Sequence, residues 1–245
     1  MRFTFTNWVV AGAAVVLSSC AGSYSTIRPQ RITNYQSVGR ADAPVEFSYQ
    51  YSALLTNGAN KKYVKKARKR GYQVVAVRVK NNTGSELNFS RDLELYFGDK
   101  PTMPVPALQA ANDLKQGVPI YLLYLLLNFS IGGTYNPQTG QTTGATFIPT
   151  GPFIAAGNMI GAGSANANMR KEFVSYDLAN KVLRPGETVY GILSLREMNV
   201  APLRLELRPG TVAAPASAPA TPATPAAAPT TPAAPAQTAP ASGGQ

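Results

Sequence analysis

Few residue types that could do chemistry are present in this chain of 245 residues, which has no histidine and a single cysteine, Cys20. Without histidine the commonest general base is missing, and the Ser-His-Asp and Cys-His nucleophile systems are excluded. The Cys and His ligand sets of zinc sites are excluded too, and one cysteine cannot form a disulfide within the chain. A Ser-Lys pair remains, but no nucleophile motif accompanies any lysine. We therefore expect no enzyme activity and no cofactor.

Carboxylates offer one further candidate site. The twelve acidic residues are spread along the chain, and the closest pair is Asp92 and Glu94. Two residues apart, they would lie on one face of a β-strand, where their oxygens could suit Ca²⁺. A solvated strand face has the same pattern and is the favoured interpretation, so we assign no metal ligand.

Cationic side chains cluster at residues 61–70, where seven of ten residues are Lys or Arg in a chain of formal net charge +11. Tyr63, Val64 and Ala67 would share one side of a helix, and Gly71 is suited to end it. The cluster could contact the phosphates of anionic lipid or lipopolysaccharide, or it could be a solvated face that aids solubility. The candidate contact residues are Lys61, Lys62, Lys65, Lys66, Arg68, Lys69 and Arg70.

The N-terminus has the pattern of an export signal. Residues 8–17 form an apolar run behind a short basic start, and ten helical residues cover about 15 Å, too little to span a bilayer. Leu17-Ser18-Ser19-Cys20 follows and resembles the lipobox of bacterial lipoproteins. The resemblance implies a signal peptide at residues 1–19, cleavage before Cys20, a diacylglyceryl group on its thiol and fatty-acylation, such as palmitate, of its amine. The alternative is an ordinary signal peptide with an incidental cysteine.

Lipidation would place the protein at a membrane, because two or three acyl chains hold it there almost irreversibly. Ala21 follows Cys20 and no acidic residue occurs before Asp42, a pattern that resembles lipoproteins sorted to the outer membrane and facing the periplasm. Nucleic acid would suit the cationic cluster electrostatically, but a lipoprotein would not meet it in that compartment. The expected partners are a membrane, anionic lipid or lipopolysaccharide, and an envelope protein.

Composition divides the rest of the chain into three parts. Residues 20–43 are polar and irregular, which is typical of a tether, and residues 44–208 would form one domain. Residues 209–245 are almost only Ala, Pro, Thr, Ser and Gly. That tail cannot bury enough apolar surface to offset its chain entropy, so we expect it to be disordered.

The domain is expected to be mainly β, an antiparallel sandwich. Apolar and polar residues alternate in residues 45–51, and short β-branched runs with Asn, Gly and Pro turns recur without a βαβ rhythm. The expected strand regions are residues 45–51, 72–80, 87–97, 188–195 and 203–207.

The strand of residues 74–82 with its Asn-rich end, and the later turn Leu183-Arg184-Pro185-Gly186-Glu187, resemble the immunoglobulin-like domains of uncharacterised bacterial lipoproteins. The resemblance covers residues 45–208 apart from a large insertion, and it implies an extracytoplasmic binding or assembly module with no catalytic residue. Pro185 presets φ, and Gly186 can adopt the positive φ of a type II turn.

Residues 116–169 are that insertion, and they contain no charged residue. We expect a helix beginning near Pro119, an amphipathic β-hairpin and then a helix rich in small residues. We expect the insertion to fold over the sandwich, with Tyr121, Leu123, Phe129 and Ile131 in the protein's own core, because the face of a sheet needs to be covered. Alternatively, it could dip into a membrane or form oligomers, since small residues permit close helix packing there.

Two functional hypotheses follow from the sequence. The first is a non-enzymatic, membrane-anchored envelope lipoprotein that binds or scaffolds. The second is a membrane-active or oligomer-forming assembly component that uses the uncharged insertion.

Overall fold

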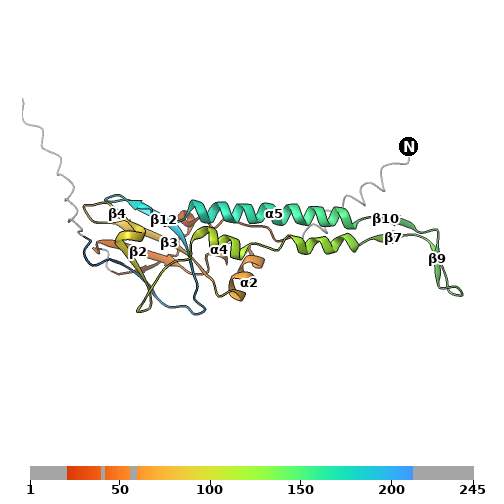
Figure 1. The fold of residues 1–245 in the computed structure, drawn as a ribbon, viewed down its shortest axis with the longest axis horizontal. Coiled ribbons are helices and arrows are strands. Elements are labelled where there is room, and N and C mark those ends of the chain that lie inside the picture. Colours follow the sequence, from red (N-terminus) through yellow and green to blue (C-terminus); the bar gives the residue numbers. More distant parts are fainter. Residues whose placement is uncertain (1–20, 40–41, 56–59, 212–245) are drawn as a thin grey trace, which may run out of the picture.

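The protein is elongated, with a compact body at one end and a narrow arm at the other (Figure 1). The computed structural model describes residues 21–39, 42–55 and 60–211. The predicted signal peptide, Cys20 and nearly all of the predicted tail lie outside these residues.

The body contains two antiparallel sheets and a short strand pair. The larger sheet has the order β1-β2-β3-β12, the smaller one β13-β5-β6, and β4 pairs with β11. The strands are β1 (Gln36–Val38), β2 (Val45–Gln50), β3 (Gln73–Asn81), β4 (Leu87–Asn88), β5 (Leu93–Phe97), β6 (Lys100–Thr102), β11 (Val182–Leu183), β12 (Thr188–Leu195) and β13 (Leu203–Leu207).

Strand β3 shows why both faces of the larger sheet are covered. Val75, Val77 and Val79 are buried in one core cluster together with side chains of β5 and β13 from the smaller sheet. Val74 and Ala76, on the opposite face of the strand, belong to a second cluster with helical side chains. Successive side chains of a strand point to opposite faces, so this nearly continuous apolar run requires a layer on each side.

Helices form that second layer (Figure 1). Side chains of α2, α4 and α5 meet in the second cluster, where Tyr63, Leu114 and Phe173 are almost fully buried. The helical elements of the body are the 3₁₀ turns η2 (Pro29–Arg31) and η3 (Ala53–Leu55), and the helices α2 (Lys61–Lys69), α3 (Phe89–Asp92), α4 (Ala107–Leu114) and α5 (Gly151–Ser175). Gly71 has a φ of 67° just after α2, which confirms the predicted helix end.

The predicted fold class is only partly right. The antiparallel sheets are present, but the fold is a mixture of α and β elements, not mainly β. Helices α2, α4 and α5 pack against one face of the larger sheet, and the sequence pattern of strands did not show this. The immunoglobulin-like sandwich itself is not confirmed. The predicted turn is present, since Glu187 N–H donates to Arg184 O at 3.0 Å and Gly186 has a φ of 75°.

The segment predicted as a tether is packed where the structure describes it. Ile27 and Ile32 are buried, and β1 extends the larger sheet. Glu172 of α5 accepts hydrogen bonds from the backbone N–H groups of Ile27 and Arg28, both at 3.0 Å, and from the Tyr24 hydroxyl. Two backbone N–H groups and one tyrosine hydroxyl of this segment therefore anchor it to α5, and composition alone could not distinguish this from a free tether.

The arm, residues 117–165, contains most of the uncharged insertion (Figure 1). Its elements are the 3₁₀ helix η4 (Pro119–Leu126), the strands β7 (Phe129–Ile131), β8 (Thr134–Asn136), β9 (Gln141–Thr143) and β10 (Thr146–Ile148), and the first part of α5. β7 pairs with β10, and β8 with β9. The predicted order of helix, hairpin and helix is confirmed. Among the described residues, no helix has the length and apolar character needed to cross a membrane.

Candidate functional site

Large apolar side chains are exposed along the arm. Leu126 is 80% exposed and Phe153 74%. Tyr121 is buried as predicted, but Leu123, Phe129 and Ile131 are 62%, 50% and 60% exposed, so the packing predicted for them on the protein's core is wrong. The exposed set is Ile120, Leu122, Leu123, Leu125, Leu126, Leu127, Phe129, Ile131, Phe147, Phe153 and Ile160.

The arm packs on itself, which explains why these side chains do not reach the body. A Cβ atom on Gly151 would lie 2.6 Å from the carbonyl oxygens of Tyr124 and Leu125, so α5 approaches η4 as closely as only glycine permits. Thr150 Oγ1 donates to Leu127 O at 3.0 Å. One stripe of α5, which includes Ile154, is buried. The remaining apolar side chains of η4 therefore face outward.

Polar contacts join the arm to the body at one level. Gln116 N–H donates to Asn166 Oδ1 at 2.7 Å, and Asn166 Nδ2 donates back to Gln116 O at 3.0 Å. The Tyr63 hydroxyl of α2 donates to the same Oδ1 at 3.1 Å. Lys62 Nζ donates to the Tyr121 hydroxyl at 3.0 Å and lies 5.4 Å from the centre of its ring. These contacts hold α2, η4 and α5 together where the arm begins.

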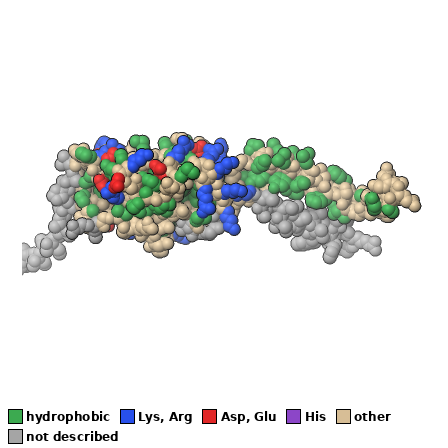
Figure 2. Space-filling model, turned by 90° about the horizontal axis from the view of Figure 1, so that it is seen from below, with side chains coloured by type: hydrophobic (Ala, Val, Ile, Leu, Met, Phe, Trp, Pro, Cys, Tyr) green, Lys and Arg blue, Asp and Glu red, His purple; other side chains and the backbone are tan. Residues whose placement is uncertain are grey.

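Cations surround this junction, and we call Lys62, Lys66, Lys115, Arg170 and Lys171 the basic collar. Lys115 precedes Gln116, Arg170 follows Asn166 by about one helical turn, and Lys66 Nζ donates to the carbonyl oxygen of Lys115. Blue side chains gather where the body meets the apolar arm (Figure 2). Burial lowers the pKa of Lys66, and the nearby charges of Arg70 and Lys115 lower it further, as expected where positive charge is concentrated.

The predicted cationic cluster is thus divided. Lys62 and Lys66 face the arm, whereas Arg70 forms an ion pair of 3.0 Å with Asp113, which also pairs with Arg196. The rest of the cluster, Lys61, Lys65, Arg68 and Lys69, is exposed on α2, with no carboxylate within 4.0 Å in the described part of the chain.

Sequence reasoning did not include Lys115, Arg170 and Lys171 among the candidate residues. A signal for them was present, because Lys115 and Arg170 are the first charged residues on either side of the uncharged run, and Lys171 follows Arg170. Their proximity to Lys62, however, depends on the pairing of Gln116 with Asn166, fifty residues apart.

The two acidic residues Asp92 and Glu94 lie on different elements, and each has a partner within the protein. Asp92 ends α3, where Arg91 Nε donates to it at 2.7 Å, and this hydrogen bond lowers the pKa of its carboxyl group. Glu94 lies on β5 and accepts from the Tyr96 hydroxyl at 2.9 Å. The helical turn of α3 replaces the continuous strand that was expected to align them. No cluster of ligands for a metal ion is found among the described residues.

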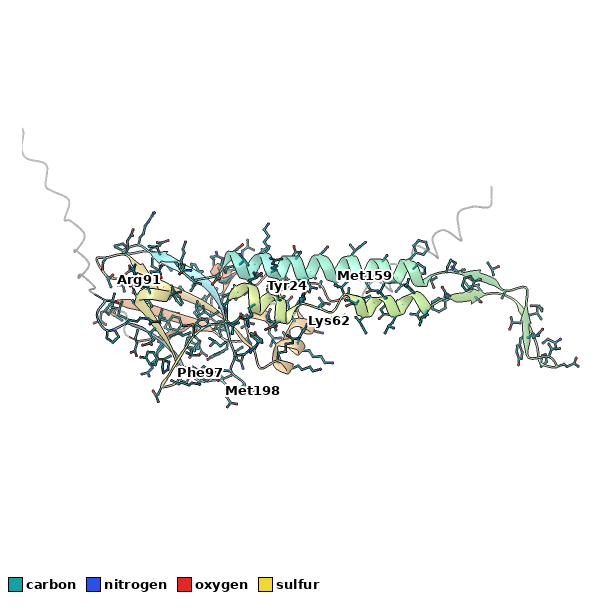
Figure 3. All side chains as sticks on the ribbon, in the orientation of Figure 1. Tyr24, Lys62, Arg91, Phe97, Met159 and Met198 are labelled. Atoms are coloured by element: carbon teal, nitrogen blue, oxygen red, sulfur yellow. The ribbon has the colours of Figure 1, made fainter. Side chains whose placement is uncertain are left out.

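Cys20 lies outside the described residues, but its neighbour Ala21 is placed. A Cβ atom on Gly161 of α5 would lie 3.3 Å from the Cβ of Ala21, and one on Gly22 would lie 2.9 Å from Cδ of Lys62. The chain that follows Cys20 therefore runs along the inner part of the arm and contacts the basic collar. Figure 3 shows Lys62 at the junction and Met159 farther out along α5.

No protein-family model matches the chain, and comparison with curated proteins and with solved structures gives no significant match.

Proposed function

We propose that the chain is a non-enzymatic lipoprotein of the cell envelope, anchored through Cys20, and that its arm enters a lipid bilayer. This is the membrane-active hypothesis, and the exposure of the arm's apolar side chains favours it over a binding or scaffolding module whose insertion is packed away. The outer membrane, with the body facing the periplasm, is the location that the sequence around Cys20 supports.

The chemistry of the arm supports a bilayer as its partner. Monomeric soluble proteins rarely expose contiguous apolar patches larger than a few hundred Å², yet the apolar side chains of η4, β7, β10 and the outer part of α5 are exposed together. A charged residue in the middle of a bilayer costs about 2.5–3.5 kcal/mol, and residues 116–169 contain none. An arm without charges can enter hydrocarbon without that cost.

The body would serve as the part that remains in water. We propose that its two facing sheets are an immunoglobulin-like sandwich, on the resemblance of the turn at Pro185 and Gly186 and the Asn-rich end of β3. Asn81 Nδ2 donates to Leu183 O at 2.9 Å, and Gly186 N–H donates to Asn81 O at 2.7 Å, so the two segments that carry the resemblance are adjacent.

Fractionation of cells that express Cys20→Ala tests the proposal, because it separates the arm from the lipid. We expect Cys20→Ala to remain with membranes and Cys20→Ala/Leu126→Asp/Phe153→Asp to be released. Met198 is 81% exposed on the body, so adding Met198→Asp is the matched control and should release nothing. A Cys20→Ala protein that is fully soluble contradicts the proposal for the arm.

Lipidation itself needs a separate measurement. Metabolic labelling with a fatty-acid analogue should tag the wild type, and Cys20→Ser should abolish the tag. If the tag survives that substitution, the lipid anchor is not on Cys20.

A further inference from the structure

We propose that the basic collar binds the phosphates of anionic lipid headgroups and thereby sets the depth to which the arm enters the bilayer. The inference rests on the proposed function, since it assigns a partner and a geometry to the same arm. It predicts that the collar lies at the phosphate level and that the arm beyond Gly161 lies in hydrocarbon.

The position of the cations along the arm is the first argument. Charge changes abruptly at the junction. The collar lies at the level of Asn166 and of the helical turn that follows it, and residues 116–169, which include the arm, contain no charged residue. Arg170 and Lys171 are exposed, with no carboxylate within 4.0 Å in the ranges that the structure describes. Cations of this kind are complementary to a surface of anionic phosphates.

The lipid attachment site gives a second, independent position for the membrane surface. Ala21 lies against Gly161, and consecutive Cα atoms are about 3.8 Å apart, so a lipid on Cys20 would be attached close to this level. Gly161 precedes Asn166 by five helical residues, which is about 8 Å. The collar would therefore lie slightly outside the glycerol level of an attached lipid, where phosphates are found.

The length of the arm agrees with this placement. From Gly161 outward to Gly151, α5 covers about 15 Å, and the strands β7 and β10, three residues each, add about 10 Å. Together they are slightly shorter than the hydrocarbon thickness of about 30 Å. Beyond them, β8 and β9 contain uncharged polar residues and Tyr135.

Vesicle binding by the processed chain, residues 20–245 with Cys20→Ala, tests the collar. We expect Arg170→Gln/Lys171→Gln to weaken binding to phosphatidylglycerol vesicles about thirty-fold, which is the affinity that two cations near an anionic surface contribute. Binding to phosphatidylcholine vesicles should be unchanged. Lys100→Gln/Lys181→Gln removes two exposed cations of the body and is the matched control.

Depth is measured in the same protein, because Cys20→Ala leaves no other thiol. A polarity-sensitive fluorophore on Leu126→Cys should enter an apolar environment and be quenched by lipid-borne quenchers, whereas one on Ser175→Cys should remain in water. Inorganic phosphate, compared with chloride at equal ionic strength, should not compete with the vesicles.

The outcomes separate the two proposals. If Leu126→Cys enters the bilayer but the Arg170→Gln/Lys171→Gln variant binds anionic vesicles like the control, the collar is overturned and the proposed function stands. If inorganic phosphate competes selectively, the collar binds free phosphate and not the phosphate of a lipid headgroup, and the proposal for the collar is overturned. If Leu126→Cys stays in water on every vesicle, both proposals fail.

Discussion

The substitution Leu123→Asp distinguishes an exposed arm from an insertion that is packed on the body. The side chain of Leu123 is 62% exposed, so Leu123→Asp removes little buried surface. Full burial of a leucine side chain contributes about 1.5–3 kcal/mol, so the loss for Leu123 should be about 1 kcal/mol or less. For a chain of this size, that lowers Tm by about 2–4 °C.

The effect on vesicle binding should be much larger. A carboxylate in the bilayer interior costs about 2.5–3.5 kcal/mol, and the lost leucine adds about 0.5 kcal/mol. Together they correspond to a loss of affinity of a hundred-fold or more at about 1.4 kcal/mol per tenfold. Thermal denaturation followed by circular dichroism and vesicle co-sedimentation measure the two effects in one preparation.

Leu114→Asp is the matched control, because Leu114 is fully buried in α4. An unpaired carboxyl group in that core costs several kcal/mol, and the domain should unfold. Our reasoning is refuted if Leu123→Asp unfolds the domain as Leu114→Asp does, or if it folds normally and still binds vesicles with unchanged affinity.

Three further predictions concern the body and the tail. Glu172→Ala leaves three hydrogen-bond donors of the N-terminal segment without their acceptor. The free energy of unfolding should therefore fall by about 2–4 kcal/mol, which calorimetry would detect as a lower Tm; an unchanged Tm would show that the segment is held by other contacts. Burial raises the pKa of Tyr51 to about 12. The contribution of its neutral hydroxyl to the free energy of unfolding is therefore complete below pH 10 and is lost as the pH rises through 12; Tyr51→Phe should flatten that part of the profile of stability against pH. Removal of residues 209–245 should leave Tm within error in a thermal melt, because that sequence has no apolar periodicity; a clear loss would mean that the tail packs on the body.

The sequence predicted those elements whose pattern is set locally. The alternation of residues 45–51 corresponds to β2, the β-branched run after Tyr72 corresponds to β3, and the glycine after the cationic helix ends α2. Period two, β-branching and a positive φ are properties of neighbouring residues, so one sequence is sufficient to show them.

Features that depend on distant pairing could not be predicted. The burial of Glu172 depends on the backbone of residues 27 and 28, far away in the sequence. Leu123 has the same local pattern whether η4 packs on the body or on α5, and only the close contact at Gly151 decides this. The sequence showed only part of the basic collar. The cluster on α2 is local in the sequence, whereas Arg170 comes close to it only through the fold.

Helix α5 is continuous from the core of the body into the arm, and this has a mechanical consequence. Met169 and Phe173, near its inner end, are fully buried, so that end is fixed in the core, and α5 is one uninterrupted helix from Gly151 to Ser175. A tilt of the arm that leaves α5 straight would therefore turn the body with it. Arg208 N–H donates to Asp92 O, beside Arg91 at the end of the body farthest from the arm (Figure 3). Such a tilt would displace this end of the body sideways, which makes it the place to attach a probe of orientation.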